Sequence, residues 1–298
     1  MPPLATSRET FADAAIRSKP IARLNSSRYS LQCSAKPPGV FTARMHASFP
    51  VLAFDCSTEW VSVALDLGSA RVVAQREPGG ARASQRLLPL VQEVLAEAGI
   101  GLRDLGLIGF GAGPGAFTGL RAACAAAQGL AFGLNLPVVP VHTLLAVAAS
   151  AVTDAPLVLA ADDARMGEIY WALALRTPAG DVHLQGDARA DAPPALAQAW
   201  IEQLGDVPRS GLALCGNAWV EHDASLRAVL PAAWRDVLDS ALMVAPDAAA
   251  IATLARAAHA RGQSVAAAQA QPIYVRNKVA LTSAERLQAR AAASQAAT

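Results

Sequence analysis

Residues 110–121, Phe-Gly-Ala-Gly-Pro-Gly-Ala-Phe-Thr-Gly-Leu-Arg, carry the strongest indication of the fold. The apolar run just before them is typical of a buried strand, and the alanine-rich run after them is typical of a helix. Their glycines permit either a turn that presents backbone N–H groups to an anion or a helix packed very close to a sheet. The stretch therefore predicts an α/β protein in which one strand leads directly into one helix.

Strand and helix patterns alternate on both sides of this turn, and the alternation restarts once. Asp55 stands six residues before Val61, and Asp163 stands six residues before Ile169, so each half begins with a strand, an aspartate, a turn and a strand. This repeat predicts two tandem lobes with a cleft for a nucleotide between them. The expected elements are strands 51–55, 61–65 and 71–75, helix 85–98, strand 107–111, helix 118–132, strand 137–141, a helix from residue 143, and strands 157–161 and 168–175.

Composition narrows the class of protein. With 53% hydrophobic and 16% charged residues the chain is globular, and residues 50–298 carry a net charge of −4, so no basic field attracts nucleic acid. The four cysteines form no Cys-x-x-Cys pair, which argues against a zinc site or a disulfide framework. No uninterrupted apolar run reaches about 18 residues, so we expect no membrane span and a cytoplasmic protein.

Four ranges are expected to differ in character. Residues 1–49 are rich in Ser, Arg and Pro, poor in acid and expected to be disordered, and residues 281–298 are expected to form a flexible tail. Residues 50–153 and 154–280 are expected to form the first and second lobes. The first 44 residues are either an organellar transit peptide or sequence upstream of a true start at Met45, and we favour the second interpretation.

Four blocks of sequence resemble the TsaB (YeaZ) family, in the same order and over residues 51–280. The blocks are Asp55-Cys-Ser-Thr58, Gly113-Pro-Gly-Ala-Phe-Thr-Gly-Leu-Arg121, Asp163-Ala-Arg-Met-Gly-Glu-Ile-Tyr-Trp171 and Pro272-Ile-Tyr-Val-Arg-Asn277. The resemblance implies two ribonuclease H-like lobes with mixed sheets, as in the actin-like ATPase superfamily. It also implies a role in forming N6-threonylcarbamoyladenosine at position 37 of certain tRNAs, beside a catalytic TsaD-type paralogue and a TsaE-type ATPase.

Two departures from the wider superfamily argue against catalysis. The TsaD family carries a His-x-x-x-His pair that holds a metal, whereas His142 stands alone here, so we expect no metal centre. At the expected base site a single glycine, Gly216, is followed by Trp219, whose indole is expected to crowd a purine. We therefore expect no tightly bound cofactor, and at most weak ATP, ADP or magnesium binding through the complex.

The residues of the expected cleft have a functional and a structural interpretation. As a vestigial nucleotide or phosphate site they would bind anions or hydrated magnesium. Structurally, the two aspartates would accept N–H bonds from tight turns and Thr118 would cap a helix, and we favour this interpretation. The cleft residues are Asp55, Ser57, Thr58, Gly113, Gly115, Asp163 and Gly216.

Without catalysis, the function is expected to lie on a surface. The helices at 85–98 and 118–132 combine a wide apolar face with small side chains, and the interface candidates are Leu87, Leu88, Val91, Leu95, Arg121 and Gln128. We expect a non-catalytic dimerisation subunit that activates a TsaD-type transferase, forms a homodimer when alone and meets tRNA only through the complex. The alternatives are an ATP-dependent small-molecule kinase or ATPase, a nuclease, or a peptidase, although Ser57, Ser84 and His142 show no recognisable triad spacing.

Overall fold

The computed structural model describes residues 49–68, 71–205 and 207–276. Phe49 is therefore the only described residue of the predicted N-terminal extension, and its ring lies edge-on against the ring of His259. The rest of that extension, the candidate start at Met45 and the predicted tail 281–298 lie outside the described residues.

The first sheet has five strands in the order β3-β2-β1-β4-β5. Strands β1, β2 and β3 pair antiparallel, and β4 pairs parallel with both β1 and β5. Strands buried on both faces need apolar residues at every position, which explains why β1 and β4 read as continuous apolar runs. The strands are β1 Val51–Asp55, β2 Trp60–Asp66, β3 Val72–Pro78, β4 Leu107–Gly113 and β5 Val138–His142.

The second sheet repeats this arrangement in the order β8-β7-β6-β9. Its first three strands pair antiparallel and β6 pairs parallel with β9, while Leu242 forms a parallel bridge with Cys215 at the place that β5 takes in the first sheet. The prediction of an α/β fold with two mixed-sheet lobes is thus confirmed. The strands are β6 Leu157–Arg165, β7 Glu168–Arg176, β8 Val182–Asp191 and β9 Leu212–Cys215.

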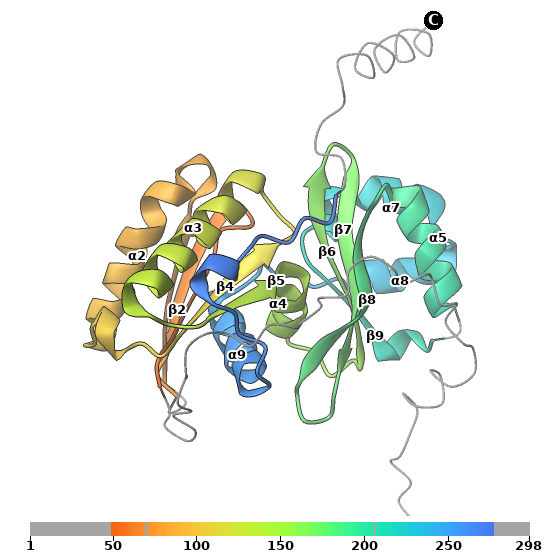
Figure 1. The fold of residues 1–298 in the computed structure, drawn as a ribbon. Coiled ribbons are helices and arrows are strands. Elements are labelled where there is room, and N and C mark those ends of the chain that lie inside the picture. Colours follow the sequence, from red (N-terminus) through yellow and green to blue (C-terminus); the bar gives the residue numbers. More distant parts are fainter. Residues whose placement is uncertain (1–48, 69–70, 206, 277–298) are drawn as a thin grey trace, which may run out of the picture.

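Helices cover both sheets on their outer sides and fill the space between them. Figure 1 shows α2 and α3 outside the first sheet, α5, α7 and α8 outside the second, and α4 and α9 between the two. The helices are α2 Ala83–Ala98, α3 Phe117–Leu134, α4 Thr143–Ser150, α5 Pro193–Leu204, α6 Ala218–Glu221, α7 Asp223–Val229, α8 Arg235–Asp239 and α9 Ala248–Ala260. The short 3-10 turns are η1 Gly80–Arg82, η2 Leu102–Asp104, η3 Arg209–Gly211, η4 Ala232–Trp234 and η5 Ala267–Gln269.

The two helices between the sheets are exchanged: each packs against the sheet formed by the other half of the chain. Helix α4 follows β5 in the chain, but Leu144 and Val147 of α4 are buried in one cluster with residues of the second sheet. Helix α9 follows the second sheet, but Ile251 and Ala255 of α9 are buried against the first. The boundaries 50–153 and 154–280 of the two lobes remain predictions. The second range includes α9, which contacts the first sheet.

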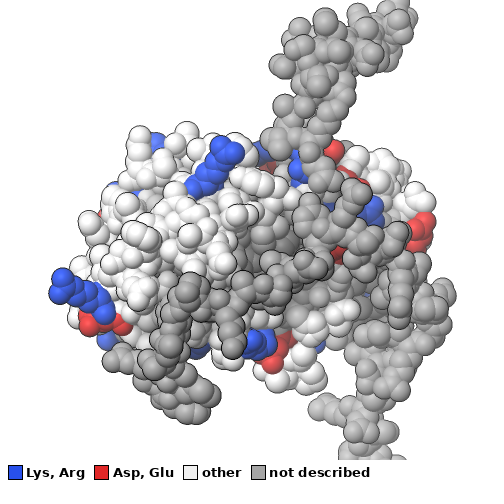
Figure 2. Space-filling model, viewed as in Figure 1, with Lys and Arg blue, Asp and Glu red and all other residues white. Residues whose placement is uncertain are grey.

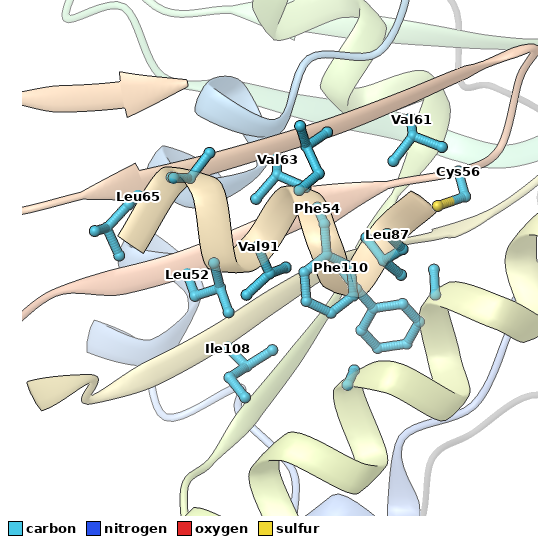
Figure 3. Packing of buried hydrophobic residues seen from close by; sticks show 14 of the residues in the cluster. Leu52, Phe54, Cys56, Val61, Val63, Leu65, Leu87, Val91, Ile108 and Phe110 are labelled. Carbon is cyan, nitrogen blue, oxygen red and sulfur yellow. The ribbon is translucent and has the colours of Figure 1, made fainter. Parts of the chain in front are cut away.

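The largest apolar cluster lies between the first sheet and α2. Figure 3 shows Phe54 and Phe110 side by side on neighbouring strands, with Leu87 and Val91 of α2 packed over them. All four side chains are at most 2% exposed. Burying a side chain of this size contributes about 1.5–3 kcal/mol, so this contact fixes α2 to the sheet.

Candidate functional site

The glycine turn joins the end of β4 to the start of α3. Gly113 N donates to Thr143 Oγ1 at 3.1 Å, and Ala116 N donates to the carbonyl oxygen of Ser57 at 2.7 Å. These two N–H groups are candidates for binding a phosphate, because they sit where a strand leads into a helix. Both are bonded within the chain instead, which supports the structural interpretation of this turn.

The same turn is closed from the C-terminal side and packed tightly beneath. Ile273 N donates to the carbonyl oxygen of Ala112 at 2.7 Å, and a Cβ at Gly113, whose φ is +122°, would overlap the carbonyl oxygen of Ile273. Helix α3 begins at Phe117, and its N-cap residue, Ala116, offers no side-chain hydrogen bond. The expectation that Thr118 caps the helix is therefore wrong, because Thr118 already lies within the first turn.

Asp55 ends β1 and is buried at the level of this turn. Its Oδ1 accepts bonds from Ser57 N at 2.8 Å and Ser57 Oγ at 2.7 Å, while Oδ2 has no partner among the described residues and lies against Gly111. Burial is the main cause that raises the pKa of Asp55 to about 6. Thr58 Oγ1 accepts from Trp60 N at 3.2 Å, so the predicted cleft residues of the first lobe are bonded mostly to their own turn.

A second buried carboxylate belongs to Asp162 rather than to Asp163, the residue that the repeat predicts. Asp162 is 8% exposed and accepts from Asn217 N at 3.3 Å. Burial raises its pKa to about 7, and the nearby charge of Asp55 adds to the shift. The two carboxyl groups therefore influence each other electrostatically.

Asp163 points to the opposite face of β6. Its Oδ1 accepts from Arg165 N at 3.0 Å and lies 3.0 Å from Nε2 of His222, and its own N–H donates to Asn217 Oδ1 at 2.8 Å. Spacing along the chain could not distinguish the neighbouring aspartates. The alternation of side chains along the strand would have done so: Val158 and Ala160 are buried in one cluster, and Asp162 is the next residue on their face of the strand.

At the place expected to hold the base of a nucleotide, the structure differs from the prediction. Gly216 lies where a Cβ would overlap the carbonyl oxygen of Ala161, so this glycine allows β9 to approach β6 closely. Trp219 is 1% exposed, packs against Trp200 and donates from Nε1 to the carbonyl oxygen of Cys215. Its indole is part of the second-lobe core, so the expectation that it crowds a purine is wrong.

The nuclease and peptidase alternatives find little support in the geometry. Within residues 49–68, 71–205 and 207–276 no three His, Cys, Asp or Glu side chains come together as metal ligands. Ser57 Oγ donates to Asp55, and Nδ1 of His142 is buried without a partner among the described residues. Burial lowers the pKa of His142 to about 4, so this imidazole is neutral at pH 7 and is not bonded to a nucleophile there.

The six interface candidates fall into three groups. Leu87, Val91 and Leu95 are at most 6% exposed and are buried against their own sheet. The prediction that these three side chains contact a partner is therefore wrong for the folded chain. Leu88 is 47% exposed. The remaining two, Arg121 and Gln128, contact the C-terminal part of the same chain: Arg121 Nε donates to Tyr274 Oη at 3.4 Å and Gln128 Nε2 to Ala270 O at 2.8 Å.

An uncharged surface remains on the outward face of α3. Arg121 is the one charged residue in the helix, and Phe132 near its C-terminal end is 82% exposed. Figure 2 shows a largely uncharged surface over this part of the first lobe. Beside Phe132 lies an open hollow of about 400 Å³, lined by Ala125, Gln128, Gly129, Phe132, Ala267 and Ala268.

The described helices, α3 included, lack the combination of length and hydropathy that crossing a membrane requires.

Comparisons with known proteins place the chain in one family. The family described as TsaD, tRNA N6-adenosine threonylcarbamoyltransferase, matches residues 75–194. The Escherichia coli tRNA threonylcarbamoyladenosine biosynthesis protein TsaB is 36% identical over 239 residues, which cover 77% of this chain and 96% of that protein. The Haemophilus influenzae protein of the same name is 34% identical, over 77% of this chain and 94% of its own length.

Solved structures agree with the sequence relatives. YeaZ from Pseudomonas aeruginosa is 35% identical with a TM-score of 0.64, and the match covers 76% of this chain and 99% of that one. A second structure, described as an uncharacterized protein with similarity to peptidase YeaZ from Pseudomonas aeruginosa, is 36% identical with a TM-score of 0.66, over 76% and 100% of the two chains. This chain, with its two mixed sheets and its glycine turn, belongs to the TsaB (YeaZ) family.

Proposed function

We propose that this protein acts in the biosynthesis of threonylcarbamoyladenosine in tRNA as a non-catalytic subunit that binds and activates a TsaD-type transferase. The names of its relatives support the pathway. The observation that carries the role of a binding subunit is the outward face of α3, where the exposed Phe132 stands beside an open hollow.

The chemistry of α3 suits a protein partner. Aromatic side chains are enriched at the centre of protein interfaces, where charged side chains are depleted, and small residues let two helices approach closely. Ala125 and Gly129 are exposed one turn apart on α3, and Phe132 follows on the same side. A helix of the partner would pack along the two small residues while the phenyl ring fills a hollow on the partner. The exposed Leu88 of the neighbouring helix α2 would extend this contact.

The interior between the lobes supports a non-catalytic role. The hydroxyl of Ser57 is bonded to Asp55, and the N–H groups of the glycine turn at Gly113 and Ala116 are bonded within the chain. A nucleotide would have to displace these contacts, so ATP, ADP or magnesium would bind weakly and through the assembled complex. We further propose that a TsaE-type ATPase joins this complex, that tRNA meets the subunit only through it, and that the chain forms a homodimer when alone.

Reconstitution tests the function. Purified chain is mixed with a TsaD-type protein, a TsaE-type protein, ATP, tRNA and threonylcarbamoyl-adenylate, and the modified adenosine is measured by mass spectrometry of the nucleosides. We expect product only when this chain and the TsaD-type protein are both present. Full modification without this chain contradicts the proposal, and saturable binding of ATP to the isolated chain in calorimetry would favour the kinase or ATPase alternative.

One substitution tests the surface. Because Phe132 is 82% exposed, Phe132→Asp is expected to leave the fold intact, while removing an apolar anchor weakens binding to the TsaD-type protein at least about tenfold. Val220→Asp is the matched control, since Val220 is 58% exposed on α6 of the second lobe. Equal affinity of the Phe132→Asp variant and the wild type would exclude α3 as the binding surface.

A further inference from the structure

Residues 270–276 cross from one lobe to the other without joining either sheet, and we call this segment the strap. Pro272 has no N–H to donate, and Ile273 N is the only strap amide for which the structure gives a backbone partner after Ala270, namely Ala112 O. A segment with so few backbone bonds is held by its side chains and by the few groups that it contacts. Its anchors on each lobe therefore decide whether it stays in place.

The strap lies on α3 and on the glycine turn in the first lobe. Ala270 O accepts a bond from Gln128 Nε2 at 2.8 Å and lies 3.4 Å from Cys124 Sγ. Farther along, the ring of Tyr274 lies 5.8 Å from that of Phe117, and the guanidinium of Arg121 lies 3.9 Å from the centre of the Phe117 ring. Cys124, at 5% exposed, is thus buried beneath the start of the strap.

Arg276 holds the other end on the second lobe. Its Nη2 donates to Ala164 O at 3.2 Å, to Arg165 O at 3.4 Å and to the Glu168 carboxylate. The side chain is only 17% exposed, and its guanidinium lies 5.8 Å from the centre of the Tyr170 ring. One side chain of the strap therefore accounts for all of these polar contacts with the second lobe.

The turn that Arg276 grips has an unusual backbone. Arg165 and Met166 have φ values of +62° and +58°, in the left-handed region that non-glycine residues avoid, and Gly167 follows at +77°. Met166 is 69% exposed, and its Sδ lies 3.9 Å from Nη1 of Arg276, so this side chain also contacts the strap. Strained turns persist where their surroundings fix them, and Arg276 supplies two hydrogen bonds to carbonyl groups of this turn.

We propose that the strap is a latch, and that the grip of Arg276 on the turn between β6 and β7 keeps residues 270–276 closed over α3. When Arg276 leaves the turn, the strap lifts from its C-terminal end and uncovers Cys124. Ala267 and Ala268, which lie three and two residues before the start of the strap, line the hollow on α3, so opening also changes the shape of that hollow. The latch gives a role to residues 272–276 of the fourth family block, which contact both lobes, and does not depend on the partner proposed above.

Thiol labelling measures the opening. The intact protein is treated with N-ethylmaleimide under native conditions, and the labelled cysteine in each peptide is followed by mass spectrometry over time. In Arg276→Met, Cys124 is expected to react at least about tenfold faster than in the wild type, because several charge-assisted hydrogen bonds are lost. Cys56 and Cys215, buried in the first and second lobes, serve as internal references and stay protected if the fold is intact.

A second variant and a control complete the test. Glu168→Gln keeps the strand residue but removes the ion pair, so it is expected to raise the labelling rate of Cys124 by a smaller factor, and it decides the question if Arg276→Met fails to fold. Arg227→Met is the matched control, because Arg227 pairs with Asp223 and Asp239 at a distance from the strap, and it is expected to leave the rate unchanged. Wild-type labelling of Cys124 in the folded latch variants would overturn the proposal.

Discussion

Asp55→Asn is expected to make the stability of the protein fall less between pH 4 and pH 8 than it does in the wild type. Asparagine keeps the Oδ1 that accepts from Ser57 N and Oγ, and it places an amide nitrogen where Oδ2 already lies without a partner among the described residues. The substitution removes a negative charge whose burial is unfavourable, and it adds amide N–H donors whose burial without an acceptor costs about 1–3 kcal/mol at every pH. The pH dependence of stability therefore isolates the cost of ionising this buried carboxyl group.

The size of the effect follows from the pKa of this carboxyl group. Burial raises it from 3.8 to about 6, so the folded state binds the proton more tightly than the unfolded state does. Stability from this group is fully present below pH 3.8 and is lost as the pH rises through about 6. One pKa unit corresponds to about 1.4 kcal/mol, so the complete loss from Asp55 is about 3 kcal/mol, of which about 2 kcal/mol falls between pH 4 and pH 8; the variant loses none of it.

Urea denaturation at several pH values from 4 to 8 checks this prediction. Unfolding is followed by the fluorescence of the buried cluster of Trp200, Trp219 and Trp234 and by circular dichroism. The free energy of unfolding of the wild type should fall over this range more steeply than that of Asp55→Asn. Asp154→Asn, at an exposed position, is the control and should follow the wild type. If the stability of Asp55→Asn has the same pH dependence as that of the wild type, the reasoning is refuted.

Two further pairs of substitutions test the packing of the first lobe by urea denaturation. Leu87→Ala is expected to cost about 2–5 kcal/mol because the side chain is 1% exposed, whereas the neighbouring Leu88→Ala should change stability by less than about 0.5 kcal/mol; equal losses would contradict the assignment of Leu87 to the core. Gly119→Ala is expected to cost about 2 kcal/mol or more, because a Cβ there would overlap the carbonyl oxygen of Cys56. Gly129→Ala, on the same helix but with open space around the Cβ, should instead stabilise by up to about 1 kcal/mol, and a loss at Gly129 would argue that its surface is already covered.

Much of the fold could be predicted because it depends on local patterns. The apolar runs and the glycine turn predict β1, β4 and α3 to within two residues at each end. Burial on both faces and helix formation each produce a recognisable pattern in consecutive residues. The repeat along the chain predicts the two mixed sheets for the same reason. The partner of α9 could not be predicted, because an apolar helix face indicates that the helix is buried but not which sheet buries it.

The candidate site was less predictable, since its contacts join distant parts of the chain. Gln128 carries the features of a surface residue in the sequence, yet its amide is bonded to Ala270, 142 positions later. The choice between Asp162 and Asp163 depends on the register of β6, which a fixed spacing does not give when one strand is longer than its counterpart. Burial of Leu87, Val91 and Leu95 depends on how α2 is rotated against the sheet, which its wide apolar face leaves open.

The exchange of α4 and α9 has a consequence for synthesis of the protein. The inner face of β1, with Val51 and Ala53, stays uncovered until α9 has been made, about 200 residues later. At about 5–20 residues per second, a nascent chain therefore carries an exposed apolar sheet face for roughly 10–40 seconds. Neither half can complete its core before the other exists, which makes the growing chain a candidate client of ribosome-associated chaperones during that interval.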